Sequence, residues 1–89
     1  MGMNAELEAW QTATNRIALE LIADESARWN VDLLDLNGRR IDTWFSGDMS
    51  AGETRSISAD VDFLVSGIYF VQFSNGTKAI TKRIPIVRN

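Results

Sequence analysis

The 89-residue chain contains no cysteine and no histidine, and it has only one proline. It therefore lacks the commonest general base, the commonest thiol nucleophile and the two commonest ligands of transition metals. Because no disulfide can stabilise the fold, a hydrophobic core must do so, and 45% apolar residues can supply one. These absences argue against most enzyme chemistry, and we expect a non-catalytic protein with no cofactor and no metal site.

Long hydrophobic runs are also missing. The run from Ile68 to Val71 is four residues long, whereas a membrane-spanning helix needs about 20. No charged segment followed by an apolar one opens the chain, as a secretory signal peptide would. We expect a single domain over residues 3–89, preceded by an artificial start at residues 1–2, with no direct membrane insertion.

Charge is distributed unevenly along the chain. The 9 basic and 12 acidic side chains give a net charge of −3, and the acidic residues are concentrated in the first 35 positions. Residues 75–89 reverse the sign, with no acidic residue and four basic ones, Lys78, Lys82, Arg83 and Arg88. The acidic overall balance argues against a nucleic-acid partner. The basic final segment suits either an acidic partner or a solvated strand face.

Apolar residues recur at every second position in four segments. These are Ile17, Leu19, Leu21 and Ala23; Trp29, Val31 and Leu33; Tyr69, Val71 and Phe73; and Ile80, Ile84 and Ile86. This period predicts strands with one buried face, and turn-forming residues about every ten positions predict an all-β sandwich. Residues 15–29 could instead form a helix capped by Asn15. We favour two strands joined by a turn at residues 24–26.

The segment around Asn37 and Gly38 predicts a hairpin. A two-residue loop would place Asp42 opposite Leu33 and bury a carboxylate, so we predict a three-residue loop over residues 36–38. In that loop the carboxylate of Asp35 accepts turn amides, and Gly38 has a positive φ. The expected pairs are Asp35–Arg39, Leu33–Ile41, Val31–Thr43 and Trp29–Phe45.

The last two strands are predicted to form a second hairpin. A two-residue turn at Asn75 and Gly76 joins them. The expected pairs are Val71–Ile80 and Tyr69–Lys82. Pro85 cannot donate a hydrogen bond to a neighbouring strand, so the last strand should lie at a sheet edge.

Three motifs in order carry a family resemblance. They are residues 29–40 (W-N-V-D-L-L-D-L-N-G-R-R), residues 64–71 after Gly52, and residues 81–88. Over residues 28–89 the chain resembles the C-terminal sorting domain of cargo proteins of the bacterial type IX secretion system. The resemblance implies a seven-stranded immunoglobulin-like antiparallel β-sandwich that performs no chemistry and directs an attached cargo across the outer membrane.

The resemblance also implies partners and locations. The expected partners are an upstream cargo domain, the outer-membrane secretion machinery and a sortase-like surface peptidase. The expected locations are the periplasm in transit, then the cell surface or the medium. The recognition residues implied by the family pattern are Gly67, Tyr69, Lys82, Ile84, Ile86, Val87 and Arg88. Of these, we expect Gly67 and Tyr69 to serve the fold first.

An alternative function is an adhesion or carbohydrate-binding accessory module of a surface protein. Trp44 falls on the face opposite the core residues, beside Asn30, and an exposed indole there could stack on a sugar ring. Asp60 and Asp62 offer oxygen ligands for calcium, but the glycine and distal glutamate of an EF-hand loop are absent from that spacing. A third alternative is an interaction module that uses an open edge strand.

Overall fold

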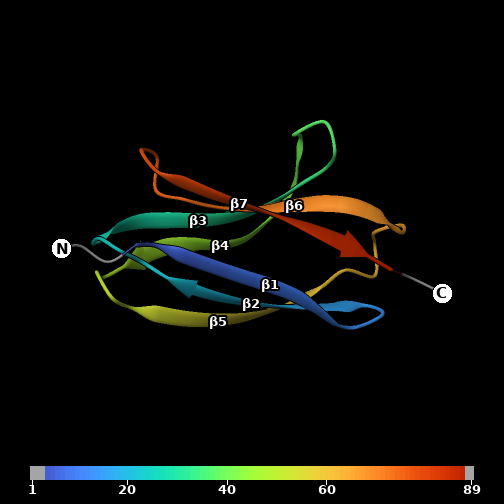
Figure 1. Ribbon diagram of the computed structural model, residues 1–89, viewed down its shortest axis with the longest axis horizontal. Coiled ribbons are helices and arrows are strands. Elements are labelled where there is room, and N and C mark those ends of the chain that lie inside the picture. Colours follow the sequence, from blue (N-terminus) through green and yellow to red (C-terminus); the bar gives the residue numbers. More distant parts are fainter. Residues whose placement is uncertain (1–3, 88–89) are drawn as a thin grey trace.

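The computed structural model describes residues 4–87, which form seven antiparallel strands (Figure 1). The strands are β1 (Glu6–Ala13), β2 (Arg16–Ile22), β3 (Ala27–Leu34), β4 (Arg40–Met49), β5 (Thr54–Asp60), β6 (Gly67–Ser74) and β7 (Ala79–Ile86). No helix occurs within this range, so none there could span a membrane. The all-β prediction is confirmed, and residues 15–29 form β2, a turn and the start of β3 rather than a helix.

The strands form two layers, with the order β1-β2-β5 in one sheet and β4-β3-β6-β7 in the other. In constant-type immunoglobulin domains the fourth strand joins the sheet of the first, second and fifth. Here β4 pairs with β3 instead. The strand β7, which contains Pro85, lies at the edge of its sheet as predicted. It lies beside β1, the edge strand of the other sheet (Figure 1).

The core lies between the two sheets and follows the alternation seen in the sequence. Its members from the four alternating segments are Ile17, Leu19, Leu21, Ala23, Trp29, Val31, Leu33, Tyr69, Val71, Phe73, Ile84 and Ile86. Ile80 is half-buried at the margin. Near the β2–β3 turn, the rings of Trp29 and Phe73 stack with centroids 4.4 Å apart. The Trp29 indole N–H donates to the Glu25 carbonyl at 3.1 Å, so its polar atom is satisfied.

The β3–β4 turn has the predicted conformation. The amide of Gly38 donates to the Asp35 carbonyl at 3.0 Å, and the amide of Asp35 donates to the Arg39 carbonyl at 2.9 Å. The Asp35 carboxylate accepts from the amides of Asn37 and Arg39, both at 2.9 Å. Gly38 has φ of +82°, a region that costs other residues more than glycine.

The register beyond this turn differs from the prediction. The observed pairs are Leu33–Asp42, Val31–Phe45 and Trp29–Gly47, so the predicted pairs with Ile41, Thr43 and Phe45 are wrong. Two register shifts leave Ile41 and Trp44 as extra residues in β4, as in β-bulges. Asp42 stays exposed because the start of β4 projects away from the other sheet, as the green hairpin in Figure 1 shows.

The register of the β6–β7 hairpin is also different. Lys82 lies opposite Val71 and Ile84 lies opposite Tyr69, so the predicted pairs are wrong. The amide of Asn75 donates to the Lys78 carbonyl at 3.1 Å, which places Gly76, with φ of +96°, inside the loop. The Asn75 side chain explains the shift, because its oxygen accepts from the amides of Thr77 and Lys78 at 3.0 and 2.8 Å. Asn75 therefore precedes the loop instead of forming its first residue.

Candidate functional site

The basic residues of the last hairpin are not equivalent. The ammonium of Lys78 donates to the Asp24 carboxylate at 2.7 Å and lies 3.5 Å from the Glu25 carboxylate. The hydrogen bond to Asp24 is the main reason why the pKa of Lys78 is raised. Lys82 and Arg83 are exposed and have no ion pair within residues 4–87. Arg88 lies outside the described residues. The free positive charge of β7 is therefore carried by Lys82 and Arg83.

The apolar residues of the terminal strand face inward. Ile84 and Ile86 are 3% and 1% exposed and belong to the core. Val87 follows the strand and is 63% exposed. In the folded domain Lys82, Arg83 and Val87 are therefore accessible from outside, whereas Ile84 and Ile86 are not. The resemblance groups these residues, but the structure separates them into a surface set and a core set.

Val87 is held by a side chain from the first strand. The Gln11 amide donates to the Val87 carbonyl at 2.9 Å, and the Val87 amide donates to the Gln11 side-chain oxygen at 3.1 Å. Both backbone polar groups of Val87 are thereby paired. Gln11 was not singled out from the sequence, because these residues lie 76 positions apart and neither strand's pattern points to the other.

Lys82 lies beside a shallow hollow between β7 and β1. The hollow has a volume of about 160 Å³ and is lined by Ala5, Glu6, Leu7, Glu8, Ile80 and Lys82. Glu6 and Glu8 line the same hollow as Lys82, but neither forms an ion pair with it. Lys82 thus occupies the open side of the sandwich, while Arg83 faces away from the core.

Tyr69 and Gly67 differ in how the structure accounts for them. The Tyr69 hydroxyl donates to the Val65 carbonyl at 2.8 Å, and the side chain is only 8% exposed. This bond to the backbone four residues upstream resembles the tyrosine corner of immunoglobulin-like sandwiches. Gly67 has no positive φ, and an added Cβ would lie 3.8 Å from the Tyr69 ring, an ordinary contact. The fold therefore requires Tyr69 but not a glycine at position 67.

The environments of two tryptophans and of Asp60 bear on the alternative functions, carbohydrate binding and calcium binding. Trp44 is half-buried and packs against the core, so it is less open than the alternative assumed. Trp10 is 44% exposed and borders a hollow of about 290 Å³ on the outer face of the three-stranded sheet. The Asp60 carboxylate accepts from the Asp62 amide at 2.8 Å and so caps a turn.

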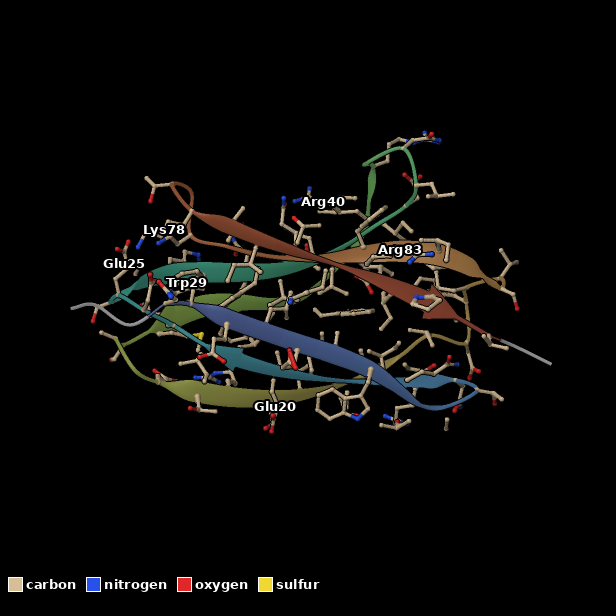
Figure 2. The ribbon with its side chains drawn as sticks, viewed as in Figure 1. Glu20, Glu25, Trp29, Arg40, Lys78 and Arg83 are labelled. Carbon is tan, nitrogen blue, oxygen red and sulfur yellow. The ribbon has the colours of Figure 1, made fainter. Side chains whose placement is uncertain are left out.

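Sequence reasoning also missed a row of residues on the outer face of the four-stranded sheet. Consecutive cross-strand pairs join Arg40 to Leu34, Leu34 to Phe70 and Phe70 to Arg83. The apolar run from Ile68 to Val71 could have indicated this row. A strand with one solvated face has polar residues at alternate positions, whereas this run places apolar residues on both faces. Figure 2 shows Arg40 and Arg83 on the side of this sheet that faces away from the three-stranded sheet.

The fold and the exposed cations of β7 define a small β-sandwich with a basic terminal edge strand. A family model for the secretion system C-terminal sorting domain matches residues 13–87, and the chain belongs to this family. Membership indicates a type IX secretion sorting signal, which implies contact with the secretion machinery, a cargo attached upstream, and export to the cell surface or the medium. The family is not catalytic. The comparison with curated proteins found no match.

Proposed function

We propose that the folded domain directs its cargo across the outer membrane through a surface that includes Lys82 and Arg83. The observation that carries the proposal is the contrast within one hairpin. Lys78 is neutralised by Asp24, whereas Lys82 and Arg83 are exposed and have no counter-ion within residues 4–87. Exposed charges of one sign favour rapid encounter with a complementary surface. In this proposal the domain crosses the periplasm before recognition.

The burial of the terminal strand supports recognition of the folded state. Ile84 and Ile86 form part of the core, so the terminal strand keeps its position only while the sandwich is folded. Gly67 is a second candidate contact, since it is exposed and the fold does not require glycine there. Tyr69 contributes indirectly by holding the segment before β6.

An export assay tests the proposal. Residues 3–89 are fused behind a signal peptide and a reporter in a bacterium that has a type IX system. The double variant Lys82→Ala/Arg83→Ala is expected to leave the reporter in the periplasm. The matched control Arg39→Ala removes an exposed arginine from the other hairpin, where it lies 3.7 Å from the Asp35 carboxylate in a solvent-exposed ion pair, and it should be exported normally. Periplasmic retention of the unaltered fusion, or normal export of the double variant, would contradict the proposal.

Truncation of the tail is a weaker test than charge removal. Deleting residues 84–89 also removes Ile84 and Ile86 from the core. Loss of two large buried side chains costs about 2–5 kcal/mol each, which is comparable with the whole stability of a small domain. Loss of export after truncation would therefore reflect unfolding as well as loss of contacts. The exposed cations can be removed without that complication.

We further propose that a sortase-like surface peptidase removes the domain after translocation. The released reporter should then be lighter than the full fusion by the mass of the domain, as measured by mass spectrometry. In a strain without the surface peptidase, the exported reporter should keep the domain. Release of an intact fusion from the unaltered strain would contradict this step and leave the sorting role untouched.

Carbohydrate binding is the second candidate function, favoured by the exposed indole of Trp10 beside the hollow on the three-stranded sheet. A titration with soluble saccharides, monitored by tryptophan fluorescence, tests it. Saturable quenching that is lost in Trp10→Phe would place the sugar there, and quenching lost only in Trp44→Phe would support the site expected from the sequence. A flat response would remove this function.

A further inference from the structure

Four residues form a continuous row across the outer face of the four-stranded sheet. Arg40 of β4 lies opposite Leu34 of β3, Leu34 lies opposite Phe70 of β6, and Phe70 lies opposite Arg83 of β7. Directly opposite residues in antiparallel strands share a face, with Cβ atoms about 5 Å apart. Three strand spacings of about 4.8 Å separate the two arginine positions by roughly 14 Å.

The centre of the row is apolar. Leu34 and Phe70 are half-buried, although their side chains point away from the core. Ile68 lies opposite Pro85 on the same face, which extends the apolar area toward the end of β7. Together these residues form a surface that we call the docking face: Leu34, Arg40, Ile68, Phe70, Arg83 and Pro85.

The ends of the row are free cations. Neither Arg40 nor Arg83 has an ion pair or side-chain hydrogen bond in the part of the chain that the structure describes. The other half of this sheet's outer face is different, because its polar side chains pair with one another. Asp32 accepts from the Thr43 hydroxyl at 2.7 Å, and Asn30 accepts from the Ser46 hydroxyl at 2.7 Å. Cations without an ion pair and apolar area therefore coincide at the end of the sheet where β3 ends and β6 begins.

We propose that the docking face binds an acidic protein surface of the secretion machinery, one that sets an apolar side chain on Leu34 and Phe70 and a carboxylate on each arginine. This inference rests on the proposed sorting function and specifies the chemical character of the partner surface. Arginine and aromatic residues are enriched at the centres of protein interfaces, and a guanidinium binds a carboxylate through two parallel hydrogen bonds. Arg83 links the docking face to the basic edge of β7.

A second copy of the chain fits this face poorly. Two copies that meet face to face through a twofold axis present the same patch to each other. The two arginines at the ends of one row would then face the equivalent apolar and cationic groups, with no carboxylate in the row to pair with them. Like charges across an interface oppose association. An acidic partner supplies counter-ions for both arginines. The structure therefore favours an acidic protein surface over a second copy of the chain.

The test uses the same export fusion with variants outside the terminal strand. Arg40→Glu reverses one end of the row, and Phe70→Thr removes the central ring while keeping a residue that favours strands. Each is expected to lower the exported reporter about tenfold, the effect of losing one well-placed interface residue. The matched control is Arg28→Glu, which changes an exposed arginine of the same sheet. Arg28 donates to the Ser46 hydroxyl at 2.9 Å and lies outside the docking face, so this variant should be exported normally.

Thermal unfolding of the purified variants separates docking from stability. Support requires export to fall while the melting temperature of Arg40→Glu stays within a few degrees of the unaltered domain. Normal export of both variants, in a strain where Lys82→Ala/Arg83→Ala fails, overturns the docking face and leaves the sorting function standing. Failure of the unaltered fusion overturns the sorting function itself. Concentration-dependent dimerisation that Arg40→Glu abolishes, measured by sedimentation, would identify a second copy as the occupant and overturn the acidic partner.

Discussion

Gln11 takes the place of a neighbouring strand for Val87. Its side-chain amide pairs with both backbone groups of Val87, at 2.9 and 3.1 Å, in the way an adjacent strand would. Since Gln11 belongs to β1 and Val87 follows β7, the contact joins the edges of the two sheets. The end of the terminal strand is thereby fixed by a residue outside the segment that matches the family model.

Gln11→Ala should release Val87 without unfolding the domain. Each hydrogen bond of this kind contributes about 1 kcal/mol net, so hydrogen exchange at the Val87 amide should become about tenfold faster. Amides in β3 and β6 should be unaffected. The control is Gln72→Ala, which removes a glutamine whose amide reaches Thr81 of β7 at 3.5 Å. Equal exchange at Val87 in both variants would show that Gln11 does not hold this residue.

Tyr69→Phe should destabilise the domain. The substitution removes the hydroxyl that donates to Val65 and leaves that carbonyl without this partner. The expected loss is about 1 kcal/mol, which lowers the melting temperature of a domain of this size by about 4–8 °C. Calorimetry or circular dichroism measures it. A melting temperature equal to that of the unaltered domain would show that the hydroxyl does not stabilise the fold.

Two glycines should respond oppositely to alanine. At Gly38, φ of +82° places an alanine in the left-handed region at a cost of about 1–2 kcal/mol. At Gly67 the backbone is ordinary and space for a Cβ exists, so alanine should be neutral or stabilising by about 0.4–1 kcal/mol. Urea unfolding of the two variants measures both values. Normal stability of Gly67→Ala with reduced export would support a recognition role, whereas a large loss of stability would refute this account of Gly67.

Glu53 should make stability depend on pH in the acid range. Its carboxylate accepts from the Ser50 amide and bonds the Arg55 guanidinium, and both lower its pKa below 4.5, the Ser50 bond more strongly. Because the pKa is lower in the folded state, this stabilisation is present above about pH 4.5 and is lost as pH falls through the folded pKa. Glu53→Gln should therefore melt lower than the unaltered domain at about pH 7, and the difference should vanish near pH 2. A constant difference across this range would contradict the prediction.

Local sequence patterns were enough to predict most of the strands, most of the core and one turn. Alternation at Ile17–Ala23, Trp29–Leu33 and Tyr69–Phe73 identified the buried residues, because a strand places every second side chain on one face. The Asp35–Gly38 turn was also predictable, since its hydrogen bonds and its positive φ are local properties of the residues in the loop. The motifs at residues 29–40, 64–71 and 81–88 were enough to place the chain in its family.

Which residues of different strands meet depends on long-range strand pairing, which local patterns do not specify. The extra residues Ile41 and Trp44 and the hydrogen bonds of Asn75 shifted both hairpin registers, and a shift of this kind changes every cross-strand pair beyond it. Lys78 forms an ion pair with Asp24, 54 positions away, and Val87 forms hydrogen bonds with Gln11 in the other sheet. Local patterns assign a side chain to a face of its own strand. They contain no information about the neighbours that long-range strand pairing places beside it, and those neighbours define the surface a partner can bind.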